Sequence, residues 1–383
     1  MNDHRDLIAL YDLGHIEEHS PGLIHWHANG IRVINRLEQY IRQLHVENNY
    51  DEVRSPIILS KSLWEQSGHW NKYKDLMFIS DDGEHPYAIK PMSCPGHISI
   101  YKQKKRSYRE LPYRQFEFGH VHRKEMSGSL SGWLRLRGFV QDDSHVICSK
   151  NDISSVIQQF VFMVEKAYKH FGFNHWEWHL SLRPNKRSGD ESIWDLAESS
   201  LKKACSELNI PIIEKPGDGA FYGPKLEAIL IDRLGRKWQC GVAQLDFVLP
   251  EKFSLSYHGN DGKEHVPVMI HHAILGSLER WLAIVMEHDG KLPDWLSPHE
   301  IAILPVSESS YHYACEIYKK ALRKGKNAFI FSEGPLSGRI REVNKNKFVS
   351  NIVIGPKESE EKMLSINNGN VKNQQIHFND WLL

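Results

Sequence analysis

Charged side chains gather on one short stretch of this chain. Residues 120–143 read HVHRKEMSGSLSGWLRLRGFVQDD and place Arg123, Glu125, Arg135 and Arg137 around a tip rich in serine and glycine. If the two flanks of the tip are neighbouring strands, their guanidinium groups can converge on one polyphosphate. A single arginine would more simply form a solvated ion pair worth less than about 1 kcal/mol, but the joint arrangement favours a phosphate site.

A second stretch belongs with the first. Residues 271–280 read HHAILGSLER, so Arg280 lies just inside a helix that begins after a strand. The two stretches predict two halves of one ATP-binding surface. Together with MSCPGH at 92–97 and AFYGPK at 220–225, they resemble the threonyl-tRNA synthetases of the class II aminoacyl-tRNA synthetase family, and the resemblance covers about residues 5–295.

The resemblance implies a metal site that the residues alone do not reveal. With 23 histidines in the chain, a given histidine is far more often a surface or core residue than a ligand, and a lone cysteine is most often a small buried apolar residue. Cys94, His145 and His271 match the residues that hold one catalytic Zn²⁺ per subunit in the family. One thiolate and two imidazoles leave coordination positions open for a substrate.

The resemblance also assigns ATP and transfer roles. Arg123 is expected to clamp the α-phosphate and the carboxylate, and Arg135 to contact the γ-phosphate. Phe139 and Arg280 would sandwich the adenine, whose edge Glu125 would meet, and Mg²⁺ would accompany ATP. His69 matches the histidine implicated in transfer near the ribose 2′-hydroxyl, although from the residues alone it would be a loop histidine. The remaining matched residues, with less defined roles, are Lys225 in catalysis, Gln239 in the ATP site, and Gln141, Asp143, Tyr222, Cys240, Gln244 and Ser277 in the substrate site.

The implied substrate is L-threonine. Threonine and valine are nearly isosteric, and an apolar pocket separates such pairs only about a hundredfold. A metal that takes the amine and the β-hydroxyl, with Asp143 accepting the hydroxyl, would reject valine but not serine. The chain begins where the family's catalytic domain begins, as in a compact form without the N-terminal editing domains. Serine errors would then be cleared by another protein, or the acceptor is not a tRNA exposed to that error, or the chain is truncated.

Hydrophobic periodicity predicts an α+β fold with an antiparallel sheet. Apolar residues at helical spacing predict helices around residues 34–44 and 153–164, the second with Asn151 or Asp152 as its cap. Tyr50 to Leu59 reads as an extended segment through Pro56. In class II synthetases a helix followed by such a strand builds the dimer interface, so the resemblance implies a homodimer, whereas Pro56 by itself more often only marks an edge strand. Alternation predicts a strand over residues 176–180, and residues 226–233 and 236–247 predict a hairpin around Leu234 and Gly235.

A change of composition near residues 291–298 predicts a domain boundary. We expect a catalytic domain over 1–295 and an anticodon-binding-like α/β domain over 296–383. The second domain should alternate strand (301–305), helix (311–323), strand (328–331), helix (near 338–346) and strand (351–354).

Two departures from the family bear on function. His272 follows the metal histidine where the family has arginine, so one positive charge is missing or depends on pH. Residues 365–373 read SINNGNVKN, with Asn367 and Asn368 in place of arginines of the anticodon-reading stretch. Because losing a bidentate base contact costs about 1–3 kcal/mol of discrimination, amino-acid activation is better supported than anticodon reading.

Composition narrows the class of protein without identifying a partner. Lysine plus arginine and aspartate plus glutamate both number 48, so net charge neither supports nor excludes a nucleic acid. Five scattered cysteines indicate a reducing cytoplasm, and no signal pattern or membrane span is visible. Three hypotheses follow: a threonine–tRNA ligase acting with tRNA(Thr), a threonine-activating enzyme that loads a carrier protein, and a regulatory relative with an inactive site. The intact arginine and metal residues argue against the third.

Overall fold

The structure, a computed structural model, describes residues 3–80, 86–368 and 373–382. The chain forms two compact units. The larger unit comprises Ile16–Ile24 and Leu37–His288, and the smaller comprises Met1–His15, His25–Arg36 and Asp289–Leu383. The helix α2 (Ala28–Glu47) therefore contributes residues to both.

An eight-stranded sheet forms the frame of the larger unit. The strands in spatial order are β10 (Ile212–Lys215), β9 (Trp176–Ser181), β11 (Lys225–Ile231), β12 (Lys237–Asp246), β15 (Val268–Ala273), β8 (Gly138–Cys148), β7 (Tyr113–His122) and β3 (Asp51–Glu52). Every pair is antiparallel except the two outermost, β10 with β9 and β3 with β7. This confirms the predicted α+β class with an antiparallel sheet.

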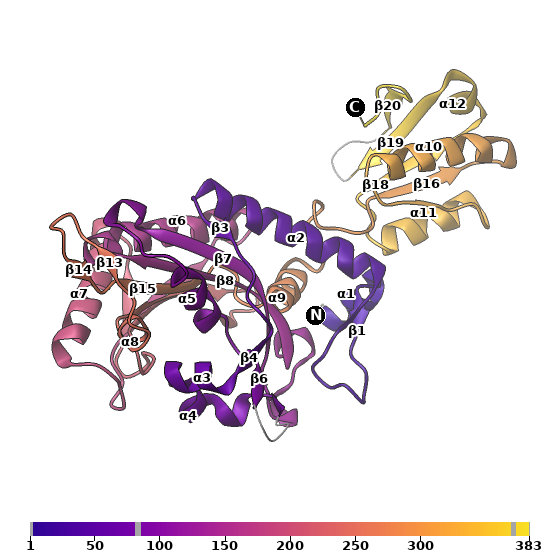
Figure 1. Ribbon diagram of the computed structural model, residues 1–383. Coiled ribbons are helices and arrows are strands. Elements are labelled where there is room, and N and C mark those ends of the chain that lie inside the picture. The colour runs from indigo at the N-terminus through magenta and orange to yellow at the C-terminus, as the bar shows by residue number, and fades with distance from the viewer. Residues whose placement is uncertain (1–2, 81–85, 369–372, 383) are drawn as a thin grey trace. The chain divides into compact units, whose positions relative to one another are not determined.

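Helices and small sheets complete the larger unit (Figure 1). The helices are α3 (Lys61–Ser67), α4 (His69–Tyr73), α5 (Cys94–Tyr101), α6 (Ile153–His170), α7 (Glu191–Glu207), α8 (Val248–Lys252) and α9 (Leu278–Asp289). The small sheets pair β4 (Ile58–Ser60) and β5 (Ile79–Ser80) with β6 (Tyr87–Ile89), and β13 (Tyr257–His258) with β14 (Glu264–His265).

The two faces of the large sheet carry different side chains, because side chains alternate along a strand. On one face, Ser144 and His272 contact α2 and α6: His45 of α2 meets Ser144, and Phe160 of α6 packs near the His272 ring. On the other face, the neighbours His145 and His271 point away from these helices and toward each other. The first face is the core of the unit, and the second carries the polar residues of the candidate site.

The predicted local elements are present in the larger unit. The spacing of α2 and α6 is confirmed, as is the hairpin of β11 and β12, in which Gly235 takes a positive φ of 75°. The expected extended segment contains only two short strands, β3 and β4. Asp152, one of the two predicted caps, holds the N-cap position of α6, but its carboxylate accepts the N–H and hydroxyl of Ser149 and makes no capping bond to the helix.

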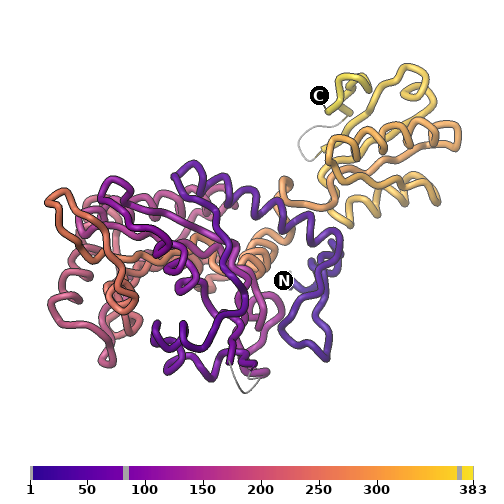
Figure 2. Tube along the Cα trace, viewed as in Figure 1, coloured from indigo at the N-terminus to yellow at the C-terminus, as the bar shows by residue number. Residues whose placement is uncertain are grey.

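The smaller unit has its own five-stranded sheet and core, seen as the orange-to-yellow trace in Figure 2. Its strands in spatial order are β17 (Ala328–Ile330), β16 (Ile301–Pro305), β18 (Ser350–Ile354), β19 (Met363–Asn368) and β20 (Gln374–His377), and its helices are α1 (His4–Tyr11), α10 (Tyr311–Arg323), α11 (Leu336–Lys345) and α12 (Pro356–Glu361), with a hairpin of β1 (Gly14–His15) and β2 (His25–Trp26). The first three sheet strands are parallel, as a strand–helix–strand alternation requires. The five elements predicted for residues 301–354 are confirmed, whereas α12, β19 and β20 were not predicted.

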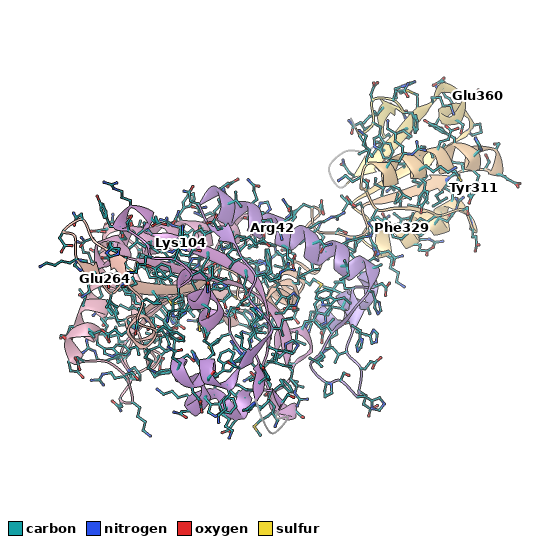
Figure 3. All side chains as sticks on the ribbon, in the orientation of Figure 1. Arg42, Lys104, Glu264, Tyr311, Phe329 and Glu360 are labelled. Carbon is teal, nitrogen blue, oxygen red and sulfur yellow. The ribbon has the colours of Figure 1, made fainter. Side chains whose placement is uncertain are left out.

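Charged side chains cover the outside of the larger unit. Lys104 and Glu264, labelled in Figure 3, have side chains that are 63% and 54% exposed. In the three described ranges, no helix is both long enough and apolar enough to cross a lipid bilayer.

Candidate active site

Strand register brings the candidate residues together. In the large sheet, Lys225 of β11 pairs with Gln244 of β12, which pairs with His271 of β15, which pairs with His145 of β8. Paired residues point to the same face of a sheet. Residues up to 126 positions apart in the sequence therefore form one continuous row, which no local pattern could reveal.

Two residues of this row, His145 and His271, form a possible metal site together with Cys94. The ligand atoms of Cys94, His145 and His271 all lie within 4.8 Å of one another, and His145 Nε2 is 2.9 Å from His271 Nδ1. Cys94 begins α5, where Pro95 suits the first turn of a helix. A thiol and two imidazole nitrogens that converge in this way fit a three-ligand site for a borderline-soft divalent cation.

Burial keeps two of the three groups neutral in the absence of an ion. Burial, with the nearby carboxylates of Asp143 and Asp246, raises the pKa of the Cys94 thiol well above its usual value. Burial, with His97 and His271, lowers the pKa of His145 well below its usual value. His145 is therefore ready to bind a cation, whereas Cys94 would release a proton when it did so.

A cavity of about 180 Å³ opens beside this cluster, and we call it the histidine cavity. Its lining includes four of the predicted substrate residues, Gln141, Asp143, Tyr222 and Gln244, together with Cys94, His145, His271 and Arg123. A volume of this size suits a small amino acid. The lining also includes Tyr73, Met92, Val242 and Ala273, which were not predicted.

A second cavity of about 240 Å³, the arginine cavity, shares Arg123, Gln141 and Val242 with the first. Its other lining residues are Glu125, Leu134, Arg135, Leu136, Phe139, Gln239, Cys240, Gly276, Ser277 and Arg280. All predicted ATP residues are in this wall, but so are Cys240 and Ser277, which we had expected beside the amino acid. Burial raises the pKa of the Cys240 thiol to about 12, so this side chain is uncharged.

The arginines are fixed by backbone and side-chain contacts. Arg280 Nε donates to the carbonyl of Leu134 at 2.8 Å, which ties α9 to the β7–β8 loop (residues 123–137). The centre of the Arg123 guanidinium is 5.3 Å from the Phe139 ring centroid, within the range of a cation–π contact. Arg135 Nη2 is 2.9 Å from Glu125 Oε2 with its side chain 51% exposed, so it is the guanidinium most open to solvent.

Lys225 lies in the row but lines neither cavity. Its Nζ is 2.8 Å from Glu227 Oε1, and the same carboxylate accepts the Gln239 amide and the Ser181 hydroxyl. Glu227 therefore holds both Lys225, a predicted catalytic residue, and Gln239, a predicted ATP residue, although Glu227 itself was not predicted.

His69 lies beside Cys94 of the metal cluster but does not line the histidine cavity. Its Nε2 is 4.0 Å from Cys94 Sγ, its Nδ1 is 2.7 Å from the Ser67 hydroxyl, and the residue is 1% exposed. Burial lowers the pKa of His69 to about 4, so the ring is neutral near pH 7.

His272 does not add a charge to the site. Its side chain points to the opposite face from His271, where Nε2 contacts the hydroxyl of Tyr50 at 2.7 Å. Burial lowers its pKa well below the usual value, so His272 is neutral near pH 7. The alternative of a pH-dependent positive charge in the substrate pocket has no support in this position.

The polar stretch that departs from the family is partly visible. Asn367 and Asn368 end β19, and the Asn367 amide donates to Asn351 Oδ1 at 3.2 Å. Residues 369–372 of the stretch lie outside the described residues.

Comparisons with known proteins show which proteins the chain is similar to. The family model described as "tRNA synthetase class II core domain (G, H, P, S and T)" matches residues 73–289. A protein named threonine–tRNA ligase from Methylibium petroleiphilum is 44% identical over 358 residues, which are 93% of this chain and 56% of that protein. A protein of the same name from Legionella pneumophila is 43% identical over 366 residues, which are 95% of this chain and 58% of that protein. The chain thus spans a little over half the length of these curated relatives.

Solved structures extend the likeness over the whole chain. A structure described as the RNA binding domain of threonyl-tRNA synthetase from Cryptosporidium parvum Iowa II has a TM-score of 0.94 and 36% identity and covers 100% of this chain and 97% of that one. A putative threonyl-tRNA synthetase from Aeropyrum pernix has a TM-score of 0.85 and 30% identity, and the match covers 98% of this chain and 90% of that one. A prolyl-tRNA synthetase from Giardia lamblia, at 13% identity and a TM-score of 0.73, shares the fold.

Proposed function

Because the chain belongs to the class II aminoacyl-tRNA synthetase family, and within it to the threonyl-tRNA synthetases, we propose that it activates L-threonine with ATP and transfers it to the 3′ end of tRNA(Thr). The observation that carries this proposal is the pair of joined cavities. One is lined by a thiol, two imidazoles and a carboxylate, and the other by arginines, and they share Arg123 and Gln141.

The histidine cavity would hold the amino acid. Cys94, His145 and His271 would hold one Zn²⁺, and the bound ion would supply open positions for the amine and hydroxyl of threonine. Asp143 would accept the hydroxyl proton, since its Oδ1 lies on the cavity wall 3.9 Å from His145 Nε2, outside hydrogen-bond reach. Valine lacks the hydroxyl and would leave Asp143 unpaired, whereas serine would fit.

The arginine cavity would hold ATP, which enters with Mg²⁺. Arg123 lies on the wall common to both cavities, so it would clamp the α-phosphate and the threonine carboxylate at once. Arg135, the most exposed guanidinium, suits the γ-phosphate, and Phe139 and Arg280 would enclose the adenine, whose edge Glu125 would meet. Gln239 lines the arginine cavity and would add a polar group there, and Lys225, which contacts the same Glu227 carboxylate, would add a positive charge beside it.

Two steps follow from this placement. The threonine carboxylate attacks the α-phosphorus and pyrophosphate leaves, with the arginines stabilising the negative charge that develops on the phosphate oxygens. In the second step a ribose hydroxyl of the acceptor attacks the adenylate carbonyl, the new ester forms, and AMP leaves as the anhydride bond breaks. His69, whose ring is neutral and whose Nε2 lies 4.0 Å from Cys94 Sγ, would act in this step near the attacking hydroxyl.

We also propose a homodimer, located in the cytoplasm. Ile57 and Ile58 of the larger unit are 45% and 59% exposed and follow Pro56 close to β3, an outer strand of the large sheet. Exposed isoleucines beside an open sheet edge suit contact with a second copy.

The catalytic part would extend to about residue 295, and residues 296–383 would contact tRNA. A carrier protein as acceptor finds no support in the comparisons.

The test is a paired assay of activation and transfer. Amino-acid-dependent exchange of pyrophosphate into ATP is measured for threonine, serine and valine, and then charging is measured with tRNA(Thr) and with a carrier protein. We expect exchange with threonine well above valine, and charging of tRNA(Thr). Absence of exchange with every amino acid would leave only a binding role, and transfer to the carrier alone would exclude the tRNA ligase.

A further inference from the structure

The two imidazoles of the metal cluster are supported in different ways. His271 Nε2 is 2.9 Å from Asp246 Oδ2, a fully buried carboxylate. Asp246 Oδ1 accepts the N–H groups of Val248 and Leu249 at 2.7 and 2.9 Å, so the carboxylate is itself fixed at the start of α8. A buried, anchored acceptor therefore holds His271 directly.

His145 has a second imidazole behind it instead. His145 Nδ1 is 2.7 Å from His97 Nδ1, and the two rings are nearly perpendicular at 84°. Each ring nitrogen can donate or accept, so the direction of this hydrogen bond depends on what His145 Nε2 does. With Nε2 directed at a cation, the proton is on His145 Nδ1, and His97 Nδ1 must accept it.

His97 is itself fixed on its far side. Its Nε2 faces Glu117 Oε1 at 3.7 Å, an electrostatic contact longer than a hydrogen bond, and its backbone carbonyl accepts the Gln115 amide at 3.0 Å. If His97 Nδ1 accepts from His145, the His97 proton is on Nε2, the atom that faces this carboxylate. The required tautomer is therefore the one that Glu117 favours.

Glu117 is held in turn by a buried polar cluster. Oε2 accepts the N–H of Ser55 at 2.7 Å, and Oε1 accepts the Ser55 hydroxyl at 2.8 Å and the Lys90 ammonium. Both charged side chains are 2% exposed. Because its hydrogen bonds hold it in place, the Glu117 carboxylate keeps a fixed position beside the His97 ring.

We propose that His97 is a positioning residue for the metal: it accepts the Nδ1–H of His145 and so directs His145 Nε2 at the cation, with Glu117 selecting the tautomer. This rests on the proposed function, because it presumes a cation at Cys94, His145 and His271. It assigns to the last residue of MSCPGH a role distinct from that of the cysteine in the same motif. Supporting partners of metal-bound histidines typically contribute about 10- to 100-fold in metal affinity.

The test compares side chains that place an acceptor at different points. In His97→Asn the amide oxygen takes the position of Nδ1, in His97→Gln it reaches the position of Nε2, and His97→Leu has none. Affinity for Co²⁺ is measured by competition with a chromophoric chelator, and the absorption spectrum of the cobalt protein reports the coordination geometry. The matched control is His45→Gln, a buried histidine that contacts Ser144 on the opposite face of the same strand.

We expect His97→Gln and His97→Leu to bind Co²⁺ about 10- to 100-fold more weakly than the parent and with an altered spectrum. His97→Asn should recover most of the affinity, and His45→Gln should match the parent. Equal affinities for His97→Asn and His97→Gln, or parental affinity in both, would overturn the assignment, and so would an equal loss in His45→Gln. Neither comparison depends on the leucine variant folding.

Exchange of pyrophosphate with threonine by the parent chain separates this inference from the proposed function. Parental exchange together with unchanged Co²⁺ binding in the His97 variants would reject only the role of His97. A parent chain that binds no Co²⁺ would reject both.

Discussion

Replacing Asp143 isolates the hydrogen bond that we assign to the threonine hydroxyl. Asp143 Oδ2 already accepts the N–H of Ser93 at 3.2 Å, whereas Oδ1 is 3.9 Å from His145 Nε2 and is free to meet a ligand. The side chain is only 10% exposed, so water replaces a lost partner poorly. A hydrogen bond to a charged group contributes about 1.5–3 kcal/mol, which corresponds to roughly 10- to 150-fold in kcat/KM.

We therefore expect Asp143→Ala to lower kcat/KM for threonine about 10- to 150-fold, and Asp143→Asn, which keeps a neutral acceptor, about tenfold. Valine has no hydroxyl, so its kcat/KM should change little and the threonine-to-valine ratio should fall. The assay is pyrophosphate exchange with each amino acid at about pH 8, because burial raises the pKa of Asp143 and the carboxylate must be ionised.

The matched control is Ser144→Ala. Ser144 is the next residue of β8, is also buried, and bonds His45 on the opposite face of the sheet. Its loss should affect stability without changing the ratio of threonine to valine. An unchanged ratio in both Asp143 variants would refute the proposed contact, and an equal change in Ser144→Ala would show that the ratio reports only general damage.

Three further outcomes are expected. Burial lowers the pKa of His45 to about 4, so the free energy of unfolding should fall as pH drops below about 6.5, by about 2 kcal/mol between pH 7 and pH 5. His45→Gln should remove that part of the pH dependence, measured by thermal unfolding. Arg280→Met should raise KM for ATP at least about tenfold in exchange assays and leave that for threonine nearly unchanged, because the guanidinium lines only the arginine cavity. Gly119→Ala would place its Cβ 2.7 Å from the buried Ser93 hydroxyl, next to Cys94, so it should cost about 1–3 kcal/mol in urea unfolding and weaken Co²⁺ binding; a parental value of both would contradict the packing argument.

Elements with a strong apolar period could be predicted from the sequence. The helix α10 begins and ends at the predicted residues, Tyr311 and Arg323, because its buried face recurs at helical spacing. The helix α12 (Pro356–Glu361) was missed because it buries none of its residues, so no such period exists. Asp152, one of two residues predicted to cap α6, holds the N-cap position, but its side chain bonds Ser149 and not the helix.

The candidate site shows the same division. Arg123, Glu125 and Arg135 could be grouped from the sequence because one loop carries all three. The proximity of His145 to His271 could not, since it depends on the register of β8 with β15. The supporting residues Asp246, Glu117 and Glu227 were missed, although a two-residue period from Gln244 already placed Asp246 on the face of the site.

The most direct test of the account is a titration of the cobalt-loaded protein with amino acids, followed by visible absorption. If threonine is selected at the ion held by Cys94, His145 and His271, threonine and serine should each change the cobalt spectrum at saturation, and valine should leave the hydroxyl-dependent part unchanged. Identical spectral changes with threonine and valine, or none with threonine while pyrophosphate exchange proceeds, would contradict it.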